Sequence, residues 1–146
     1  MNDVRYLLDT VSINRLPLDL LNSVFVQSNC NVPLDVCYEV GNLRKQQAVQ
    51  KIIEKMSADL LHIVQSLLHE IGTNNKVLDI YHNEGNGDVI LVATALMKKE
   101  QESLTLFKNN WIIVSDDKDL QELAKQKGVK AMSTEAFKQR AINYAQ

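Results

Sequence analysis

Acidic residues at four separate points of the chain are the residues best able to do chemistry. Each stands at a junction between expected elements of secondary structure: Asp9 after the apolar run 4–8, Glu39 within 37–40, Asp88 at the start of 88–96, and Asp117 and Asp119 after 111–115. Carboxylates that folding brings together repel one another and raise each other's pKa unless a cation neutralises them. A cluster drawn from distant parts of a chain is most simply explained by a divalent metal ion. Function therefore depends on whether these side chains meet.

The residue types at these positions favour a hard cation. Carboxylate oxygens suit Mg²⁺ or Mn²⁺, whereas zinc sites use histidine and cysteine. The two cysteines, Cys30 and Cys37, have no companion pair at zinc-ligand spacing, so we expect reduced structural thiols. His62 and His69 are seven residues apart, about 10 Å along a helix, which is too far to ligate one ion directly. We expect both histidines to be partly buried or in solvent.

Length and charge limit the class of protein. A chain of 146 residues fits a single domain, and we expect one domain over residues 1–146. The formal net charge of −2 gives no support to avid, non-specific binding of nucleic acids. A polyanionic partner would have to be met by a local basic patch and by metal, although each basic residue can equally be part of a solvated helix face. The candidates for that patch are Arg15, Arg44, Lys45, Lys98 and Lys99.

The chain shows no sign of membrane insertion or export. Its start lacks a basic segment followed by an apolar stretch, and no apolar run reaches the ~18 residues of a membrane span. We therefore expect a soluble, cytoplasmic protein.

Hydrophobic periodicity predicts alternating strands and helices. The expected strands are 4–8, 24–26, 111–114 and 129–132, with a loop at 29–33. The first expected helices are a short one at 18–21 and one that begins at Pro33, with Asn31 as its cap. A long helix is expected over 46–71 with a bend near 57–59. Further helices are expected over 88–102, 118–127 and 134–144. Residues 77–81 fit either a helix or an extended piece, before a loop at 83–87. This alternation predicts a three-layer α/β/α domain with a mainly parallel central sheet.

The expected positions of the acidic residues agree with a shared site. Ligands of parallel α/β folds collect outside the carboxyl ends of the strands, where Asp9 and Asp117 fall. Asp88 and Glu39 are expected near helix starts, where the helix dipole favours a carboxylate. Each acid alone also fits a simpler role as a helix cap or turn residue. Taken together, with Ser115 two residues before Asp117, they favour one site.

The order of these motifs resembles the PIN-domain family of metal-dependent ribonucleases over nearly the whole chain. The motifs are a strand followed by Asp9, a helix bearing Glu39, Gly87-Asp88-x-x-Leu91-x-Ala93-x-Ala95, and Ile113-Val114-Ser115-Asp116-Asp117-Lys118-Asp119-Leu120. In the family a strand leads to Thr or Ser, a variable residue and then Asp, as in Ser115-Asp116-Asp117. The stretch from Asp9 to Glu39 is compact for the family, and Leu120 stands where many members carry Phe, but neither departure removes a carboxylate.

The resemblance implies an endoribonuclease that hydrolyses RNA phosphodiester bonds with Mg²⁺ or Mn²⁺ and leaves a 5′-phosphate and a 3′-hydroxyl. It implies that Asp119 assists through water and that Ser115 orients a carboxylate or a bound water. The residues that it implies hold one or two ions are Asp9, Glu39, Asp88 and Asp117. If Glu39 faced away, Asp35 on the same helix face would replace it. Members of this size are often toxins of the VapC type, which implies a small antitoxin partner and a homodimer.

Other chemistries fit the motifs less well. A haloacid-dehalogenase-like phosphatase needs a second Asp where Val11 stands, and a receiver domain needs an early acidic pair, whereas Asp116 and Asp117 come late. No Gly-rich segment ends in Gly-Lys-Ser/Thr, and the segment after Asp117 lacks the Gly and Glu of an EF-hand. The alternative of a different class is a catalytically silent PIN-like interaction or RNA-binding module, in which the acids serve local structure.

Overall fold

A parallel sheet lies at the centre of the protein. The computed structural model describes residues 3–71, 87–106 and 108–144. The strands are β1 (Val4–Leu8), β2 (Cys30–Pro33), β3 (Ile53–Glu54), β4 (Asn110–Val114) and β5 (Lys130–Met132). Their order across the five-stranded sheet is β3-β2-β1-β4-β5, and every neighbouring pair is parallel. The predicted parallel sheet is confirmed.

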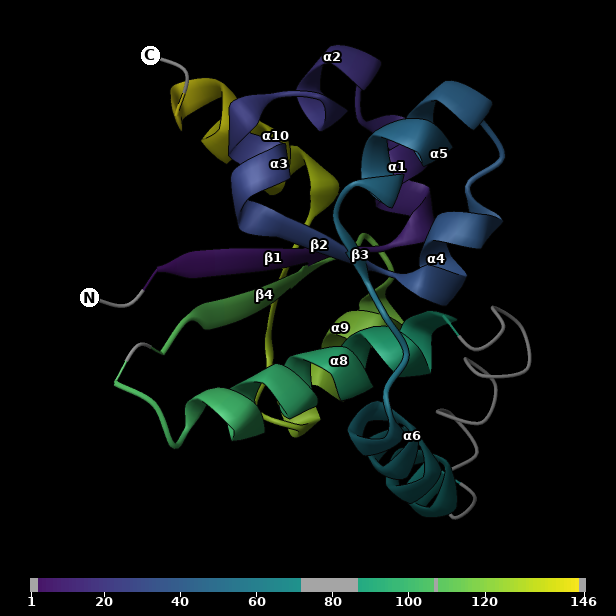
Figure 1. Ribbon diagram of the computed structural model, residues 1–146, viewed down its shortest axis with the longest axis vertical. Coiled ribbons are helices and arrows are strands. Elements are labelled where there is room, and N and C mark those ends of the chain that lie inside the picture. Colours follow the sequence, from purple (N-terminus) through teal and green to yellow (C-terminus); the bar gives the residue numbers. More distant parts are fainter. Residues whose placement is uncertain (1–2, 72–86, 107, 145–146) are drawn as a thin grey trace.

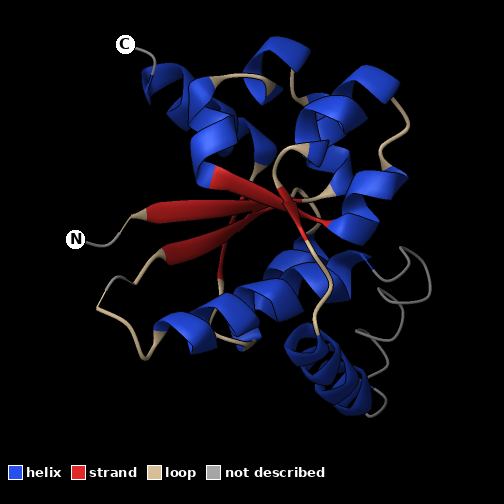
Figure 2. Cartoon of the chain, viewed as in Figure 1, coloured by secondary structure: helices blue, strands red, loops and turns tan. Residues whose placement is uncertain are grey.

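Helices cover both faces of this sheet (Figures 1 and 2). On one side lie α1 (Thr10–Arg15), α2 (Leu18–Leu21), α3 (Val24–Asn29), α4 (Leu34–Glu39), α5 (Leu43–Gln50) and α10 (Thr134–Tyr144). On the other lie α6 (Ala58–Ile71), α8 (Gly87–Glu102) and α9 (Lys118–Gln126). The three-layer α/β/α architecture is therefore confirmed. No helix in the described part of the chain is both long and apolar enough to cross a membrane.

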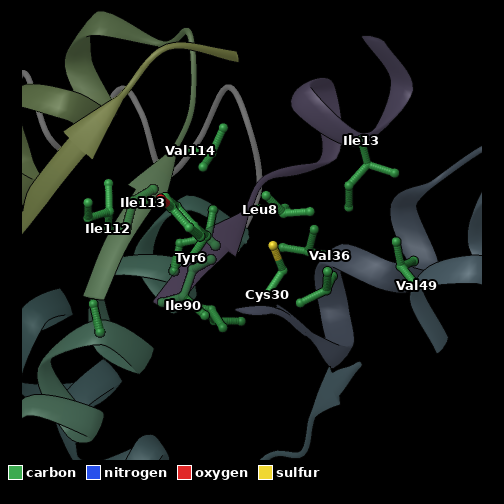
Figure 3. Packing of buried hydrophobic residues seen from close by; sticks show 14 of the residues in the cluster. Tyr6, Leu8, Ile13, Cys30, Val36, Val49, Ile90, Ile112, Ile113 and Val114 are labelled. Carbon is green, nitrogen blue, oxygen red and sulfur yellow. The ribbon is translucent and has the colours of Figure 1, made fainter. Parts of the chain in front are cut away.

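Strands β1 and β4 form the centre of the core (Figure 3). Leu7, Leu8, Ile113 and Val114 are each 0% exposed, as expected for parallel strands that helices cover on both faces. The register pairs Leu8 with Val114. The residues that follow these two strands, Asp9 and Ser115, therefore leave the sheet side by side.

The prediction between residues 24 and 33 is wrong. The run expected as a strand is the start of α3, and the strand β2 occupies the segment expected as a loop. Ser23 caps α3, because its hydroxyl accepts a hydrogen bond from the amide of Val26 at 3.3 Å. A short apolar run fits a helix or a strand equally well, and here the cap decides. Asn31 is not a cap, since it lies in β2 and its side-chain Oδ1 accepts from the Arg5 guanidinium.

The prediction of a single long helix over 46–71 is also wrong. The segment is divided into α5, the strand β3 and α6. Between α5 and α6 the chain joins the sheet instead, with Ile53 paired to Val32. A helix restarts after Ser57, whose hydroxyl accepts from the amide of Leu60 at 3.1 Å. The segment expected at 77–81 and most of the loop expected at 83–87 lie outside the described residues.

The expected helices over 88–102, 118–127 and 134–144 are all present to within a residue. Gly128 follows α9 with a φ of 74°, the left-handed conformation that favours glycine at the end of a helix.

Replacing Gly128 by Ala should lower the free energy of unfolding by about 1 kcal/mol, because a Cβ is disfavoured at positive φ. The added Cβ would lie 3.6 Å from Lys99 Nζ, which is an ordinary contact, so the cost is conformational. Gly41→Ala is the matched control, because its Cβ would meet nothing within 4 Å and its φ is not positive. Urea denaturation in which the two variants are equally stable would contradict this reading.

Candidate active site

Asp9 is anchored to the ends of both central strands. It directly follows β1 and caps α1, where its Oδ1 accepts from the Ser12 amide at 2.7 Å. Its own amide donates to the carbonyl oxygen of Val114 at 3.3 Å. Asp9 is buried, with only 5% of the residue exposed to solvent. A carboxylate held this firmly at the carboxyl end of a parallel strand lies where such folds bind ligands.

A buried hydroxyl network supports this anchor. The Ser12 hydroxyl lies 3.1 Å from the carbonyl oxygen of Val114 and 2.7 Å from the Thr134 hydroxyl. Both residues are buried, so these bonds join the first turn of α1 to the end of β4 and the start of α10. Sequence reasoning missed the network. The spacing of Ser12 from Asp9 fits a capping turn, but nothing local indicates Thr134, more than a hundred residues away.

Glu39 reaches the residue next to Asp9. Its Oε2 accepts a hydrogen bond from the Thr10 hydroxyl at 3.0 Å. The expectation that Glu39 lies near a helix start is wrong, since it is the last residue of α4. The helix dipole disfavours a carboxylate there, so helix stability does not account for this acid. Asp35, its expected substitute, lies in the first turn of the same helix and has no hydrogen-bond partner among the described residues.

Ser115 and Asp117 form a tight turn at the carboxyl end of β4. The Ser115 hydroxyl accepts from the Asp117 amide at 3.1 Å, and the Ser115 carbonyl accepts from Gln121 Nε2 at 2.6 Å. Asp117 caps α9, because its Oδ1 accepts from the amides of Asp119 and Leu120 at 2.9 and 3.1 Å. Asp119 is exposed in the first turn of α9. Ser115 thus orients the backbone of Asp117. Asp117 caps a helix, the simpler role that the sequence also predicted for it.

Asp116 has a structural role that the sequence did not reveal. Its Oδ1 accepts from the Thr134 amide at 2.8 Å, and its Oδ2 pairs with the Arg15 guanidinium at 2.6 Å. Burial alone would raise the pKa of this carboxyl, but the hydrogen bonds from Thr134 and the charge of Arg15 outweigh it and hold the pKa below its usual range. The contacts bring a guanidinium beside the Ser115–Asp117 turn.

Asp88 lies in the first turn of α8, but its side chain is outside what the structure describes. Figure 1 shows the start of α8 at the end of the molecule toward which β1 runs. A helix that connects two parallel strands runs antiparallel to them, and the position of α8 before β4 fits such a crossover. Among the side chains that are described, no three His, Cys, Asp or Glu residues are grouped so that they could hold a metal ion.

The donors nevertheless suit a hard cation. Asp9, Glu39 and Asp117 each use one carboxylate oxygen for the hydrogen bonds given above. The other oxygen of each has no protein partner within the described ranges. A hydrogen bond on one oxygen orients a carboxylate, and the second oxygen can then meet a cation or a water. The donor set fits Mg²⁺ or Mn²⁺.

The basic candidates differ in their surroundings. Lys45 Nζ donates to the carbonyl oxygen of Asn14 in α1 at 2.6 Å, whereas Lys98 is paired with Glu54 at 2.6 Å. Arg44 and Lys99 are exposed. Lys45 is thus held against α1, the helix that Asp9 caps, and Arg15 ends that helix with its guanidinium paired to Asp116.

Within the described residues, neither the two cysteines nor His62 and His69 hydrogen-bond to the acids of this site. Cys30 and Cys37 are buried free thiols, as expected, and burial raises the pKa of both. A thiol held protonated is a poor metal ligand. His62 and His69 are exposed on α6.

Comparison of the sequence with models of known protein families gives a match to the PIN domain over residues 6–135. The match runs from within β1 to the start of α10 and includes every acidic position discussed above. A comparison with curated proteins gives no match.

Asp116→Asn should lower the free energy of unfolding at pH 7 by about 1 kcal/mol, because a charged acceptor is lost from Thr134 and Arg15. Since the folded-state pKa of Asp116 is depressed, its contribution is present above the unfolded value of 3.8 and is lost as pH falls through the folded value. Urea denaturation at pH 7 and pH 3 should therefore show a difference from wild type that shrinks in acid. A difference that grows in acid would contradict the assignment.

Proposed function

Because the chain belongs to the PIN-domain family, a family of nucleases that act on RNA or DNA, we propose that it is a metal-dependent endoribonuclease. The observation that carries the proposal is the hydrogen bond from Thr10 to Glu39. It fixes an acid from α4 to Thr10, the residue that follows Asp9 at the carboxyl edge of the sheet. Neither strand pairing nor helix capping requires an acid there, whereas a cation site does.

The proposed ion ligands are four carboxylates from separate elements: Asp9, Glu39, Asp88 and Asp117. When bound, Mg²⁺ or Mn²⁺ neutralises the phosphate oxygens and makes water a better nucleophile. The Ser12 amide holds Asp9 in place, Ser115 holds the turn that carries Asp117, and Asp119 acts through water. Water adds to phosphorus as the bond to the 3′ oxygen breaks, which leaves a 5′-phosphate and a 3′-hydroxyl.

A catalytically silent PIN-like module that binds RNA or protein is the second candidate. One observation favours it: Asp9 and Asp117 both cap helices, and capping alone could account for them. Glu39 has no such role, because it ends its helix. A decisive variant must therefore remove the negative charge and keep the cap.

A toxin role, a small antitoxin partner and a homodimer follow from the resemblance alone, and a cytoplasmic location from the pattern of apolar and basic residues. They stay predictions, as does the single domain over residues 1–146.

Asp9→Asn and Asp117→Asn should each slow RNA cleavage by about 100-fold or more, because an amide caps a helix as well as a carboxylate but binds Mg²⁺ poorly. The melting temperature should stay close to that of wild type. Labelled single-stranded RNA with Mn²⁺, resolved on a gel, measures the cleavage. Asp35→Asn is the matched control and should cleave normally, since Glu39 is the acid of α4 that is hydrogen-bonded to Thr10. Cleavage by Asp9→Asn or Asp117→Asn at the wild-type rate would contradict these ligand assignments. No cleavage by the wild type itself would favour the silent module.

Millimolar Mg²⁺ or Mn²⁺ should raise the melting temperature of the wild type, since an ion that binds only the folded state stabilises it by mass action. Asp88→Asn should reduce this shift and abolish cleavage with little loss of fold. Differential scanning fluorimetry over a metal titration measures both proteins. A shift that is absent in the wild type, or equal in the two proteins, would contradict a metal site that includes Asp88.

A further inference from the structure

A second functional surface lies along the free edge of the sheet. Strand β5 ends the strand order, so one side of it has no neighbouring strand among the described residues. Two adjoining hollows of about 190 and 570 Å³ lie against this edge and share Gly128, Val129 and Lys130. The first also includes Trp111 from the start of β4. Together they form a continuous depression around the outermost strand.

The lining of this depression is cationic. Of the described residues that line the two hollows, none is acidic and four are basic: Lys99, Lys125, Lys130 and Arg140. Lys125 and Lys130 are exposed and have no hydrogen-bond or ion-pair partner in the described part of the chain. Lys99 has only a long bond, 3.5 Å, to the Gly128 carbonyl. In a chain of net charge −2, this is a marked local excess of positive charge.

Acidic groups near the depression are already engaged. Glu102 does not line it, and its two oxygens accept from Asn109 and from the Trp111 indole at 2.9 to 3.1 Å. Arg5 and Lys98 each lie 5.7 Å from the centre of the Trp111 ring, and Lys98 is paired with Glu54 at 2.6 Å. The excess of positive charge therefore comes from the four basic residues that line the depression.

The surface continues toward the candidate active site over helix α9, where Lys118, Lys125 and the acidic Glu122 line it. A third hollow lies over α9 and shares Gln121 and Lys125 with the second, and it reaches Lys118, the residue after Asp117. Gln121 also bonds the Ser115 carbonyl oxygen at 2.6 Å. Helix α9 has nine residues, so this stretch is about 13 Å long. The depression thus extends from the amino ends of β4 and β5 toward the proposed carboxylate site.

We infer that this edge, lined by Lys99, Lys125, Lys130 and Arg140, binds the backbone of single-stranded RNA beside the bond that is cut. The inference rests on the proposed function and extends it. Proteins that bind single strands without sequence preference use a basic groove that follows the phosphates, with aromatic groups for the bases. The depression offers such a groove, with the amides of Asn109 and Asn110 and the Trp111 ring beside its lysines.

Charge favours RNA over another protein strand at this edge. A free edge can also pair with a strand from a second copy of the chain. Lysines, however, are a common device against such pairing, because two copies would place like charges together. The surface is therefore complementary to a polyanion and not to itself.

The test compares two double variants that change the net charge equally. Lys125→Glu/Lys130→Glu alters the edge, and Lys51→Glu/Lys55→Glu alters exposed lysines beside β3, at the opposite edge of the sheet. Fluorescence anisotropy with a labelled single-stranded RNA of about 20 nucleotides, without divalent metal, measures binding over a range of salt. The first variant should bind about tenfold or more weakly, with a salt slope reduced by about 1.4, since each phosphate contact contributes about 0.7 for single strands. The control should remain within about threefold of wild type.

Cleavage separates this inference from the proposed function. The edge variant should cut the long RNA slowly but a tetranucleotide at the wild-type rate, because the short RNA does not reach the edge. If the wild type cut neither RNA, the nuclease proposal would fail, while the binding comparison would still decide the inference. Equal binding by the two double variants, or no binding by the wild type, would overturn it. Light scattering gives the other outcome that would overturn the inference. If the wild type were a dimer and the edge variant a monomer with unchanged RNA binding, the edge would belong to contact with a second copy.

Discussion

The placement of one buried carboxylate, that of Asp9, is the constraint on which the site depends. The parallel register of Leu8 and Val114 brings the ends of β1 and β4 together, and the amide of Asp9 bonds across them. The Ser12 hydroxyl then fixes the first turn of α1 to β4 and α10. A buried anion is costly unless hydrogen bonds or a cation stabilise it. One oxygen of Asp9 has the Ser12 amide, and the proposed cation would stabilise the other.

The sequence predicted the fold well wherever local signals and burial agree. Residues 4–8 and 111–114 are apolar runs long enough to be central strands, and the last helix begins and ends at the predicted residues. The predictions failed where a short apolar run fits two structures. At Val24 a serine cap made it a helix, and at Ile53 pairing with Val32 turned a helical pattern into a strand. The pairing partner is distant in sequence, so no local pattern contains that information.

For the site, the sequence identified residue types and missed their contacts. It placed Asp9 and Asp117 at strand ends, because a turn after an apolar run is a local feature. It misplaced Glu39 at a helix start, since the end of a short helix depends on tertiary packing. The Asp116 pair with Arg15 and the Thr134 bond to Ser12 join segments about a hundred residues apart. The cationic edge was also missed, because its lysines become neighbours only after β5 joins the sheet.

The most direct test of the account is a crystal structure of the wild type with Mn²⁺, in which anomalous scattering locates the ion. We expect a peak in direct contact with a carboxylate oxygen of Asp9 and with oxygens of at least two of Glu39, Asp88 and Asp117. Asp9→Asn crystals grown in the same way should lose that peak. Manganese bound elsewhere, or a wild-type site in which these carboxylates face away from one another, would contradict the account.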